Sequence, residues 1–379
     1  MKSTLLNYDG LTWTNLAGEC IQNKISADLV LCFGSKQILS APDLYSKITA
    51  QFSSSHIAMC STSGEIIETH VQDNTLVAVA FQFEKTKIKT SSVNVLDYKN
   101  SFEAAQSLIH DLPMLDLAYI LVLSDGSLVN GSELVKGLNE SVDSKILITG
   151  GLAGDGANFK STLVGLNNSP KQGLIIAIGF YGKDIVVTSG SKGGWDMFGP
   201  EKVITKSEEN KLFELDDKNC LEIYKRYLGP EVDNLPFSAL HFPLSVLLPG
   251  DKQSVVRTIL GISEEEQSMT FAGDVPIGSK VRFMKANFDS LTSAAASSAS
   301  QTLLKEGRHP DFSLLISCVG RKLVLGSRIE EEVESANDLF KGKTPLLGFY
   351  SYGEISPMLD EVSCALHNQT MTITSFYEF

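Results

Sequence analysis

Three glycine–carboxylate pairs are the residues of this 379-residue chain whose types and spacing best suit chemistry. They are Gly64-Glu65, Gly154-Asp155 and Gly353-Glu354, and each follows an apolar run typical of a buried strand. Glycine lets backbone N–H groups approach a ligand, and a carboxylate accepts hydrogen bonds from an ammonium or a hydroxyl group. Ligands usually bind at the strand ends of a sheet that helices cover. The pattern therefore predicts a small-ligand site at these edges.

Arg321 follows another apolar run and offers the opposite charge. Its planar guanidinium can hold a carboxylate through two parallel hydrogen bonds. An amino acid needs both a cationic and an anionic partner, so Arg321 with Glu354 or Asp155 is a coherent ligand-binding hypothesis. In the alternative interpretation these are turn residues, and Arg321 and Glu354 form an internal salt bridge. Tyr352 and Trp195 could form aromatic walls of the same pocket, although aromatic residues at strand ends more often belong to the core.

Other chemistry has little support in the sequence. There is no Gly-x-Ser-x-Gly, no His-Glu-x-x-His and no metal-ligand spacing of Cys and His, so we expect neither an enzyme nor a metal site. A haem group needs an axial His, Cys or Tyr in an apolar pocket. His241, between Leu240 and Phe242, has the most apolar neighbours of the six histidines, but no diagnostic motif surrounds any of them.

Composition narrows the class of partner and the compartment. The net charge of −13 argues against a nucleic acid or an anionic membrane surface as partner. Acidic clusters at 264–266 and 330–334 are expected to be solvated faces. Six scattered cysteines without a Cys-x-x-Cys pair fit a reducing compartment. With neither a signal peptide nor a run of the roughly 18 apolar residues that a spanning helix needs, we expect a cytoplasmic protein.

The same order of elements recurs three times along the chain. Apolar runs begin near residues 28, 117 and 311, and each is followed by a stripe at helical spacing, a second run with a glycine turn, and a third run. We predict a mixed α/β fold of repeated β-α-β-β units whose sheets are flanked by helices. One sheet and two stacked sheets both remain open. We divide the chain into a lead-in, 1–27, and two domains, 28–220 and 221–379.

Two segments of the C-terminal half carry local signals of helices. The Ala/Ser-rich run from Ser290 to Thr302 is predicted to be a helix whose small face packs closely on a sheet. Ser327 and Glu330 have the spacing of a capping box that would begin another helix.

Motifs along most of the chain after residue 25 resemble the two FIST domains. The N-terminal domain is recognised in Gly150-Gly151-Leu152-Ala153-Gly154-Asp155, with Phe159 and Thr162, and in Ser191-x-Gly193-Gly194-Trp195. The C-terminal domain is recognised in Ser317-Cys318-x-Gly320-Arg321, Pro345-Leu346-x-Gly348-Phe349-Tyr350-x-Tyr352-Gly353-Glu354-Ile355 and His367-Asn368-Gln369-Thr370.

The resemblance implies a bacterial sensory module that binds small ligands such as amino acids. It also implies an alternative, because some family members bind haem and respond to nitric oxide. Family members commonly act with histidine kinases or cyclic-di-GMP enzymes, and this chain leaves no room for such a domain, so we expect a separate signalling partner. Our first hypothesis is a sensor of amino acids or similar metabolites, and the alternatives are a haem-based nitric oxide sensor and an enzyme acting on a small metabolite.

Overall fold

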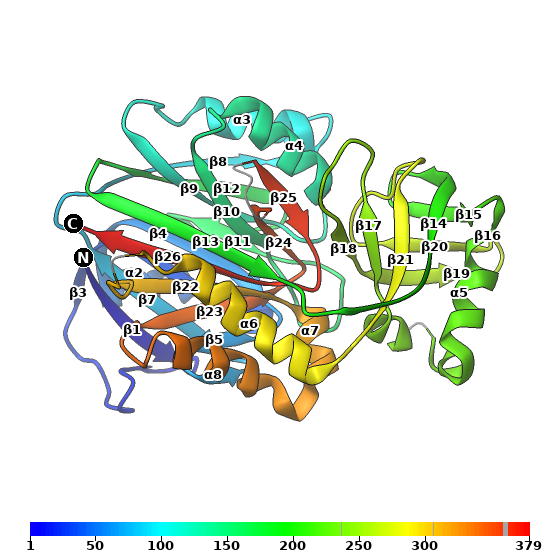
Figure 1. Cartoon of the computed structure of the whole chain (residues 1–379). Helices are drawn as coiled ribbons and strands as arrows, with labels where there is room; N and C mark the ends of the chain where they lie inside the picture. The colour runs from blue at the N-terminus through cyan, green and yellow to red at the C-terminus, as the bar shows by residue number, and fades with distance from the viewer. Residues whose placement is uncertain (236, 306, 359–362) are drawn as a thin grey trace.

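The computed structural model describes residues 1–235, 237–305, 307–358 and 363–379, which form a large body and a smaller β-rich domain at one end (Figure 1). One continuous segment of the chain forms the small domain, from β14 (Asp196–Glu208) to β21 (Lys280–Lys285). The large body contains the parts of the chain that precede and follow this segment in the sequence. Its two ends lie side by side, with the Met1 amino group 3.0 Å from Glu378 Oε2.

Within the described residues, the strands of the large body form three six-stranded sheets. The first contains, in spatial order, β11 (Val164–Leu166), β4 (Phe52–Thr62), β3 (Ile25–Ser35), β7 (Leu76–Gln82), β1 (Lys2–Tyr8) and β2 (Trp13–Thr14). The second contains β25 (Cys364–His367), β24 (Gly353–Pro357), β10 (Leu147–Leu152), β9 (Leu117–Ser124), β12 (Leu174–Tyr181) and β8 (Lys87–Asn94). The third contains β13 (Ile185–Lys192), β26 (Met371–Glu378), β22 (Phe312–Cys318), β23 (Leu346–Ser351), β5 (Glu65–Ile67) and β6 (His70–Gln72).

Helices join the two parallel strands at the centre of each sheet, as parallel pairing requires. The connections are α1 (Lys36–Leu39) and α2 (Leu44–Gln51) in the first unit, α4 (Gly131–Ser141) in the second, and α7 (Val319–Leu325), η4 (Gly326–Arg328) and α8 (Ile329–Leu339) in the third. η1 (Val95–Asp97) and α3 (Ser101–His110) precede β9, and α6 (Phe288–Thr302) precedes β22.

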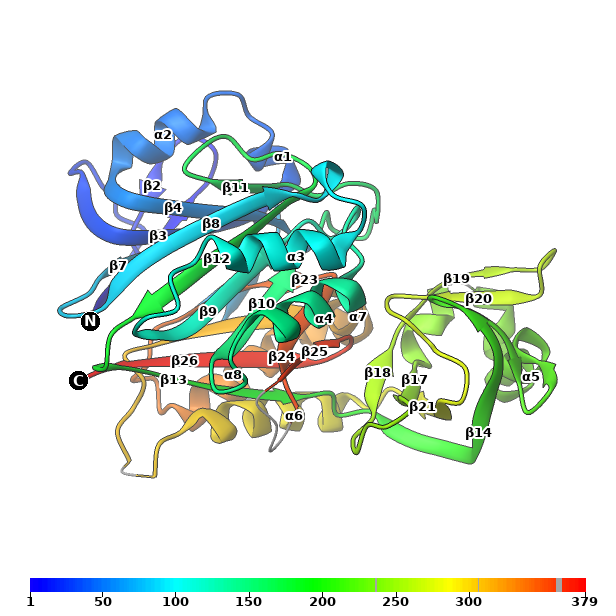
Figure 2. The same cartoon turned by 90° about the horizontal axis from the view of Figure 1, so that it is seen from above.

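The core lies where the inner faces of the three sheets meet. In β9, for example, Leu121 and Leu123 belong to a cluster with residues of all three sheets, whereas Ile120 and Val122 pack with residues of α3 and α4 on the outer face. Figure 2 shows these helices outside the sheets. A strand buried on both faces needs a continuous apolar run, which is why these strands are visible in the sequence.

The three units interlock by exchanging short strands. β5 and β6 follow β4 along the chain but extend the third sheet at β23. β11 follows β10 but pairs with β4 of the first sheet. β24 follows β23 but pairs with β10 of the second sheet, and β25 pairs with β24 at the edge of that sheet. This cyclic exchange brings the ends of β4, β10 and β23 together, as the bonds Ser63 N to Tyr350 O (2.8 Å), Gly154 N to Ser61 O (2.9 Å) and Tyr352 N to Leu152 O (3.0 Å) show.

The small domain has its own eight-stranded sheet and its own core. Between β14 and β21 lie β15 (Lys211–Leu215), β16 (Lys218–Asn219), α5 (Cys220–Leu228), η2 (Gly229–Asn234), η3 (Phe237–His241), β17 (Leu244–Leu247), β18 (Val255–Arg257), β19 (Ile259–Ser263) and β20 (Ser268–Phe271). β18 forms one edge of this sheet and lies nearest the large body.

The structure confirms the mixed α/β class, the repeated units and the flanking helices, and it shows three sheets around one core where the sequence left one or two open. The predicted helix at 290–302 is confirmed as α6, and a Cβ on Gly190 of β13 would overlap the carbonyl oxygen of Ser298. The lead-in 1–27 contributes β1 and β2 to the first sheet, and the division at 220 falls inside the small domain. The predicted capping box is wrong: the 3-10 turn η4 precedes α8, and no side chain of the described residues caps that helix.

Candidate functional site

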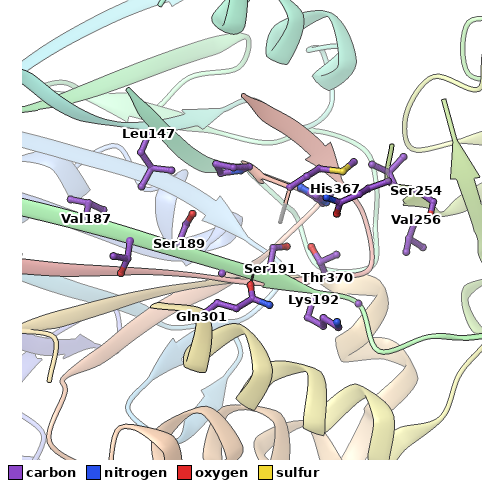
Figure 3. Close-up of a pocket in the computed structure, with 17 residues that line it drawn as sticks. Leu147, Val187, Ser189, Ser191, Lys192, Ser254, Val256, Gln301, His367 and Thr370 are labelled. Carbon is purple, nitrogen blue, oxygen red and sulfur yellow. Dashed lines mark hydrogen bonds between the residues drawn. The ribbon is translucent and has the colours of Figure 1, made fainter. Parts of the chain in front are cut away.

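Two cavities lie between the large body and the small domain. The α4 cavity, of about 790 Å³, is lined by Ser132, Val135, Lys136, Asn139, Glu140, Leu248, Pro249, Asp251, Val255, Arg257, Asp274, Pro276, Met358, Ser363, Cys364, Ala365 and Leu366. The β13 groove, of about 630 Å³ (Figure 3), is lined by Leu147, Val187, Thr188, Ser189, Gly190, Ser191, Lys192, Gly193, Gln253, Ser254, Val255, Val256, Gln301, Pro357, Met358, His367 and Thr370. They share Val255 and Met358, so they are neighbours. Both have the volume and the mixed lining of small-molecule sites.

Arg257 is a buried cation on the wall of the α4 cavity. It is 3% exposed, and its guanidinium is held by carbonyl oxygens of both domains, with Nε donating to Asp274 O (3.2 Å) and Nη1 donating to Leu366 O (2.9 Å). Within the described residues, its Nη2 donates no hydrogen bond and no carboxylate forms a salt bridge with it. Burial lowers the pKa of Arg257 to about 10, opposed by Asp274 and Asp251, so it stays charged at neutral pH.

Asp274 places a carboxylate on the wall of the same cavity. Its backbone N–H donates to Ser132 Oγ (3.1 Å), which ties the loop to the first turn of α4. Its Oδ1 is buried and accepts no hydrogen bond from the described part of the chain. The preceding residue is glycine, and a Cβ there would lie 3.0 Å from Arg257 Nε, so a larger residue would press on the guanidinium.

On the wall of the α4 cavity, Nη2 of Arg257 and Oδ1 of Asp274 thus both lack a hydrogen-bond partner among the described residues. A buried charge is costly unless it is paired and hydrogen-bonded. A ligand carboxylate could take two N–H groups of the guanidinium, and a ligand ammonium could donate to Asp274 Oδ1. The arrangement suits a small zwitterion.

The β13 groove holds a different set of side chains. Figure 3 shows Ser189, Ser191 and Thr370 on the large body and Ser254 and Val256 on the small domain. The Nε2 atom of His367 lies 3.0 Å from Ser356 O, and because a carbonyl only accepts, Nε2 carries the proton and Nδ1 is left as an acceptor. Burial lowers the pKa of His367 to about 4, so its ring is neutral at neutral pH.

Arg321 lies in a different place from the one the ligand-binding hypothesis requires. Its side chain is 0% exposed, and Nη2 lies 2.6 Å from Glu332 Oε2. Its remaining donors reach the carbonyl oxygens of Leu291 (2.8 Å) and Gly193. Arg321 thus forms an internal salt bridge, but the partner named in the alternative interpretation is wrong, because the acid is Glu332 rather than Glu354. The expectation that the cluster 330–334 is solvated is wrong for Glu332, which is buried on the inner face of α8.

Glu65 and Glu354 occupy matching positions at the start of exchanged strands. Glu354 accepts from Ser351 Oγ (2.7 Å) and from Thr370 N (3.2 Å) and Oγ1 (2.9 Å). Glu65 accepts in the same way from Thr62 Oγ1 (2.5 Å) and from Thr75 N and Oγ1, so these carboxyls anchor the loops at the crossings. Burial raises the pKa of Glu354 to about 8 and that of Glu65 to about 7, against the opposing hydrogen bonds.

The third glycine–carboxylate pair joins two units. Asp155 accepts a hydrogen bond from Tyr352 Oη, and Gly154 has no room for a side chain because a Cβ would overlap Ser63 Oγ. Tyr352 also stacks on Phe159, with 4.7 Å between ring centroids. The structure thus brings Asp155 to Tyr352, and it places Asp155 and Glu65 on the wall of a third, polar cavity of about 400 Å³.

The remaining predicted residues lie apart from the α4 cavity. Gly353 begins β24 at a crossing between units. Trp195 is 7% exposed and donates from Nε1 to Gln369 O (2.9 Å), in a small cluster with Leu291 and Val324. His241, the haem alternative, ends η3 in the small domain and is absent from the described linings of both interdomain cavities. Among the described residues, no group of three or more His, Cys, Asp or Glu could hold a metal ion.

Arg257 and Asp274 were missed by the sequence argument. One signal was present: Arg257 interrupts the apolar run from Val255 to Gly261, and a charge inside a buried strand requires a partner. Asp274 gave no signal, because an aspartate between glycine and valine reads as an ordinary turn residue.

Two family models match consecutive parts of the sequence. The family model of the FIST N domain matches residues 28–218, and that of the FIST C domain matches residues 220–357. No curated protein matches the chain. None of the described helices is long and apolar enough to cross a membrane. The two family matches follow one another over most of the chain, which therefore belongs to the FIST family of sensory domains in signal transduction proteins.

Proposed function

We propose that this FIST protein senses an amino acid or a similar small zwitterionic metabolite, which it binds in the α4 cavity. The observation that carries the proposal is Arg257, a guanidinium that is 3% exposed on a cavity wall and has no carboxylate partner in the described chain. Asp274 supplies the acceptor for the ligand ammonium. The amino-acid hypothesis is thus retained, with Arg257 and Asp274 in the roles first given to Arg321 and Glu354.

The position of the cavity suggests how binding is reported. α4 and β25 belong to the large body, whereas Arg257 and Asp274 belong to the small domain. A ligand that touches both sides favours the arrangement in which the cavity is closed around it, because its affinity for that arrangement is higher. We propose that a separate signalling protein in the cytoplasm, such as a histidine kinase or a cyclic-di-GMP enzyme, distinguishes the ligand-bound arrangement of the two domains from the ligand-free one. We also propose that the ligand is released unchanged.

A thermal melt against the twenty amino acids tests this proposal. A ligand at a hundred times its dissociation constant stabilises the folded protein by about 2.7 kcal/mol. The matched variants are Arg257→Met and Arg321→Met, which remove one buried guanidinium each. We expect Arg257→Met to lose the ligand-induced shift, and Arg321→Met to melt at a lower temperature but keep the shift.

Two results would reject the proposal. A panel without any shift in the wild-type protein would leave the cavity without a zwitterionic ligand. A shift that Arg257→Met and Asp274→Asn both retain would place the ligand elsewhere. Chromatography of the hit after incubation with the protein should recover it intact, and its conversion would indicate an enzyme instead.

A further inference from the structure

β13 has one free edge that faces the β13 groove. Within the described residues it is the terminal strand of the third sheet, and β26 is its one strand partner. α6 covers its outer face closely at Gly190, and Gln301 of α6 occupies the edge at Ser191, so the edge that remains open lies at Val187 and Ser189. The groove lining follows this strand without a break from Val187 to Gly193.

Two hydrogen bonds identify which backbone groups point out of the sheet. Ser191 N–H donates to the side-chain oxygen Oε1 of Gln301 (3.1 Å) and not to its strand neighbour Thr372, so Ser191 and Thr372 form a non-hydrogen-bonded pair. Just before β13 begins, Phe379 N–H donates to Asp184 O (2.8 Å). The backbone groups of the even-numbered residues of β13 therefore bond to β26. Because the two kinds of pair alternate, the N–H and C=O groups of Val187 and Ser189 point away from β26.

The opposite wall of the groove also consists of strand edges. Val255 and Val256 belong to β18, the edge strand of the small-domain sheet, and His367 belongs to β25, the edge strand of the second sheet. Edge strands from three sheets therefore meet around one groove of about 630 Å³. Side chains already bond the outward backbone groups of β25, with Asn139 at Cys364 and Arg257 at Leu366 O. β13 is therefore the edge on which we focus, because unpaired edge groups are templates for an added strand.

Most of the edge of β13 lacks the charges that usually protect such a strand. β8, the corresponding edge of the second sheet, carries the exposed Lys87 and Lys89. β13 has no charged side chain from Ile185 to Ser191, and its one charged residue is Lys192 at its end. Lysine on an edge prevents pairing with another chain. The difference between two equivalent strands of one molecule indicates that the edge of β13 is kept open for a partner.

We infer that the β13 groove binds an extended peptide segment of a partner protein, which adds to β13 as a further strand. The charges in the groove define the chemistry of the segment. Lys192 and the neutral His367 are the ionisable side chains of the described lining, and it contains no carboxylate. A neutral or acidic segment is therefore favoured over a basic one. Alternate apolar residues of the segment would contact Val187, Val256 and Met358, because successive side chains of a strand point to opposite faces.

Proline substitutions test this geometry. Ser189→Pro removes an N–H that points into the groove, and an edge strand tolerates proline at such a position. Val186→Pro, at an exposed side chain, removes an N–H that bonds to β26, so it should lower the melting temperature sharply while Ser189→Pro leaves it nearly unchanged. This control shows that the edge has been assigned correctly.

The binding probe is a displayed library of random seven-residue peptides, selected on the full-length wild-type protein. We expect enriched sequences with alternating apolar residues and few basic ones, and about tenfold weaker binding of the synthetic peptides to Ser189→Pro, the effect of losing one or two hydrogen bonds. The peptide should slow hydrogen exchange at the amides of Val187 and Ser189.

Four results would overturn the inference, and three of them concern peptides. They are a selection without enrichment, peptides that bind Ser189→Pro as tightly as the wild type, and exchange at Val187 and Ser189 that the peptide leaves unchanged. If an amino acid rather than a peptide protects these two amides, the groove is a metabolite site and the inference is wrong.

Discussion

Arg321 and Glu332 form an ion pair from which solvent is excluded, with Nη2 and Oε2 2.6 Å apart and both side chains 0% exposed. The Glu332 carboxylate also accepts from Ser317 Oγ (3.0 Å) and Tyr350 Oη (2.9 Å), so its second oxygen is satisfied as well. The pair ties α7 to α8 behind the third sheet. Because both charges are fully partnered, we interpret Arg321 as structural, in contrast to the other buried arginine, Arg257.

Breaking this pair should cost much of the protein's stability. We expect Arg321→Met to lose about 3–5 kcal/mol of the free energy of unfolding, because it leaves the Glu332 charge buried without a cation. Urea unfolding of the wild type, Arg321→Met and the double variant Arg321→Met/Glu332→Leu measures it, and the double variant should recover part of the loss. A loss under about 1 kcal/mol in the single variant would contradict a pair fully removed from water.

The pair also shows why the partner of a buried charge is hard to predict from sequence. Arg321 was identified from its place after an apolar run, but its partner lies in a cluster of acids at 330–334 that resembles a solvated helix face. Only the packing of α8 decides that Glu332 points inward with Val333 and Ala336. Charge pairs depend on which helix face is buried, and a cluster of like residues hides that face.

The strands of the repeated units could be predicted from the sequence because they are buried on both faces. The exchange of short strands between units could not be predicted in this way. Strands such as β9 and β22 are buried on both faces and must be continuously apolar, so a short window of sequence identifies them. The exchanged strand β5 is three residues long, and its partner β23 lies far along the chain. Nothing in so short a segment specifies which sheet it joins. The α4 cavity was missed for the same reason, because its walls come from elements distant in sequence.

Glu354 should make stability fall as the pH rises. Its pKa is about 8 in the folded protein and near its ordinary value of 4.5 in the unfolded chain, so between these values the folded state holds a proton that the unfolded state has lost. By proton linkage the free energy of unfolding then decreases with increasing pH, by up to about 1.4 kcal/mol per pH unit for one proton. Glu65, with a pKa of about 7, adds to the effect over a narrower range.

Denaturant unfolding at pH 5, 6.5 and 8 measures this dependence. In Glu354→Gln, which cannot ionise, the decrease should be smaller than in the wild type over the whole range. Identical pH profiles for the two proteins would show that Glu354 is already ionised at pH 5.

Gly348 marks a close approach between parallel strands. A Cβ at this position of β23 would overlap the carbonyl oxygen of Leu315 in β22, which is backbone and cannot turn aside. We expect Gly348→Ala to destabilise the protein by about 1–3 kcal/mol, as overpacked cores do. Gly261→Ala is the matched control, since a Cβ there meets nothing within 4 Å. Equal melting temperatures for the two variants would refute the close approach.

The roles of Arg257 and Asp274 are tested most directly by calorimetric titration of the amino acid that the melting panel identifies. The free acid and its carboxamide are titrated into the wild type, Arg257→Met and Asp274→Asn. The wild type should prefer the free acid by about tenfold or more, equivalent to about 1.4 kcal/mol. Arg257→Met should bind both forms weakly and without preference, whereas Asp274→Asn should bind weakly but keep the preference. Wild-type affinity and preference in Arg257→Met would contradict a ligand carboxylate held by this guanidinium between the two domains.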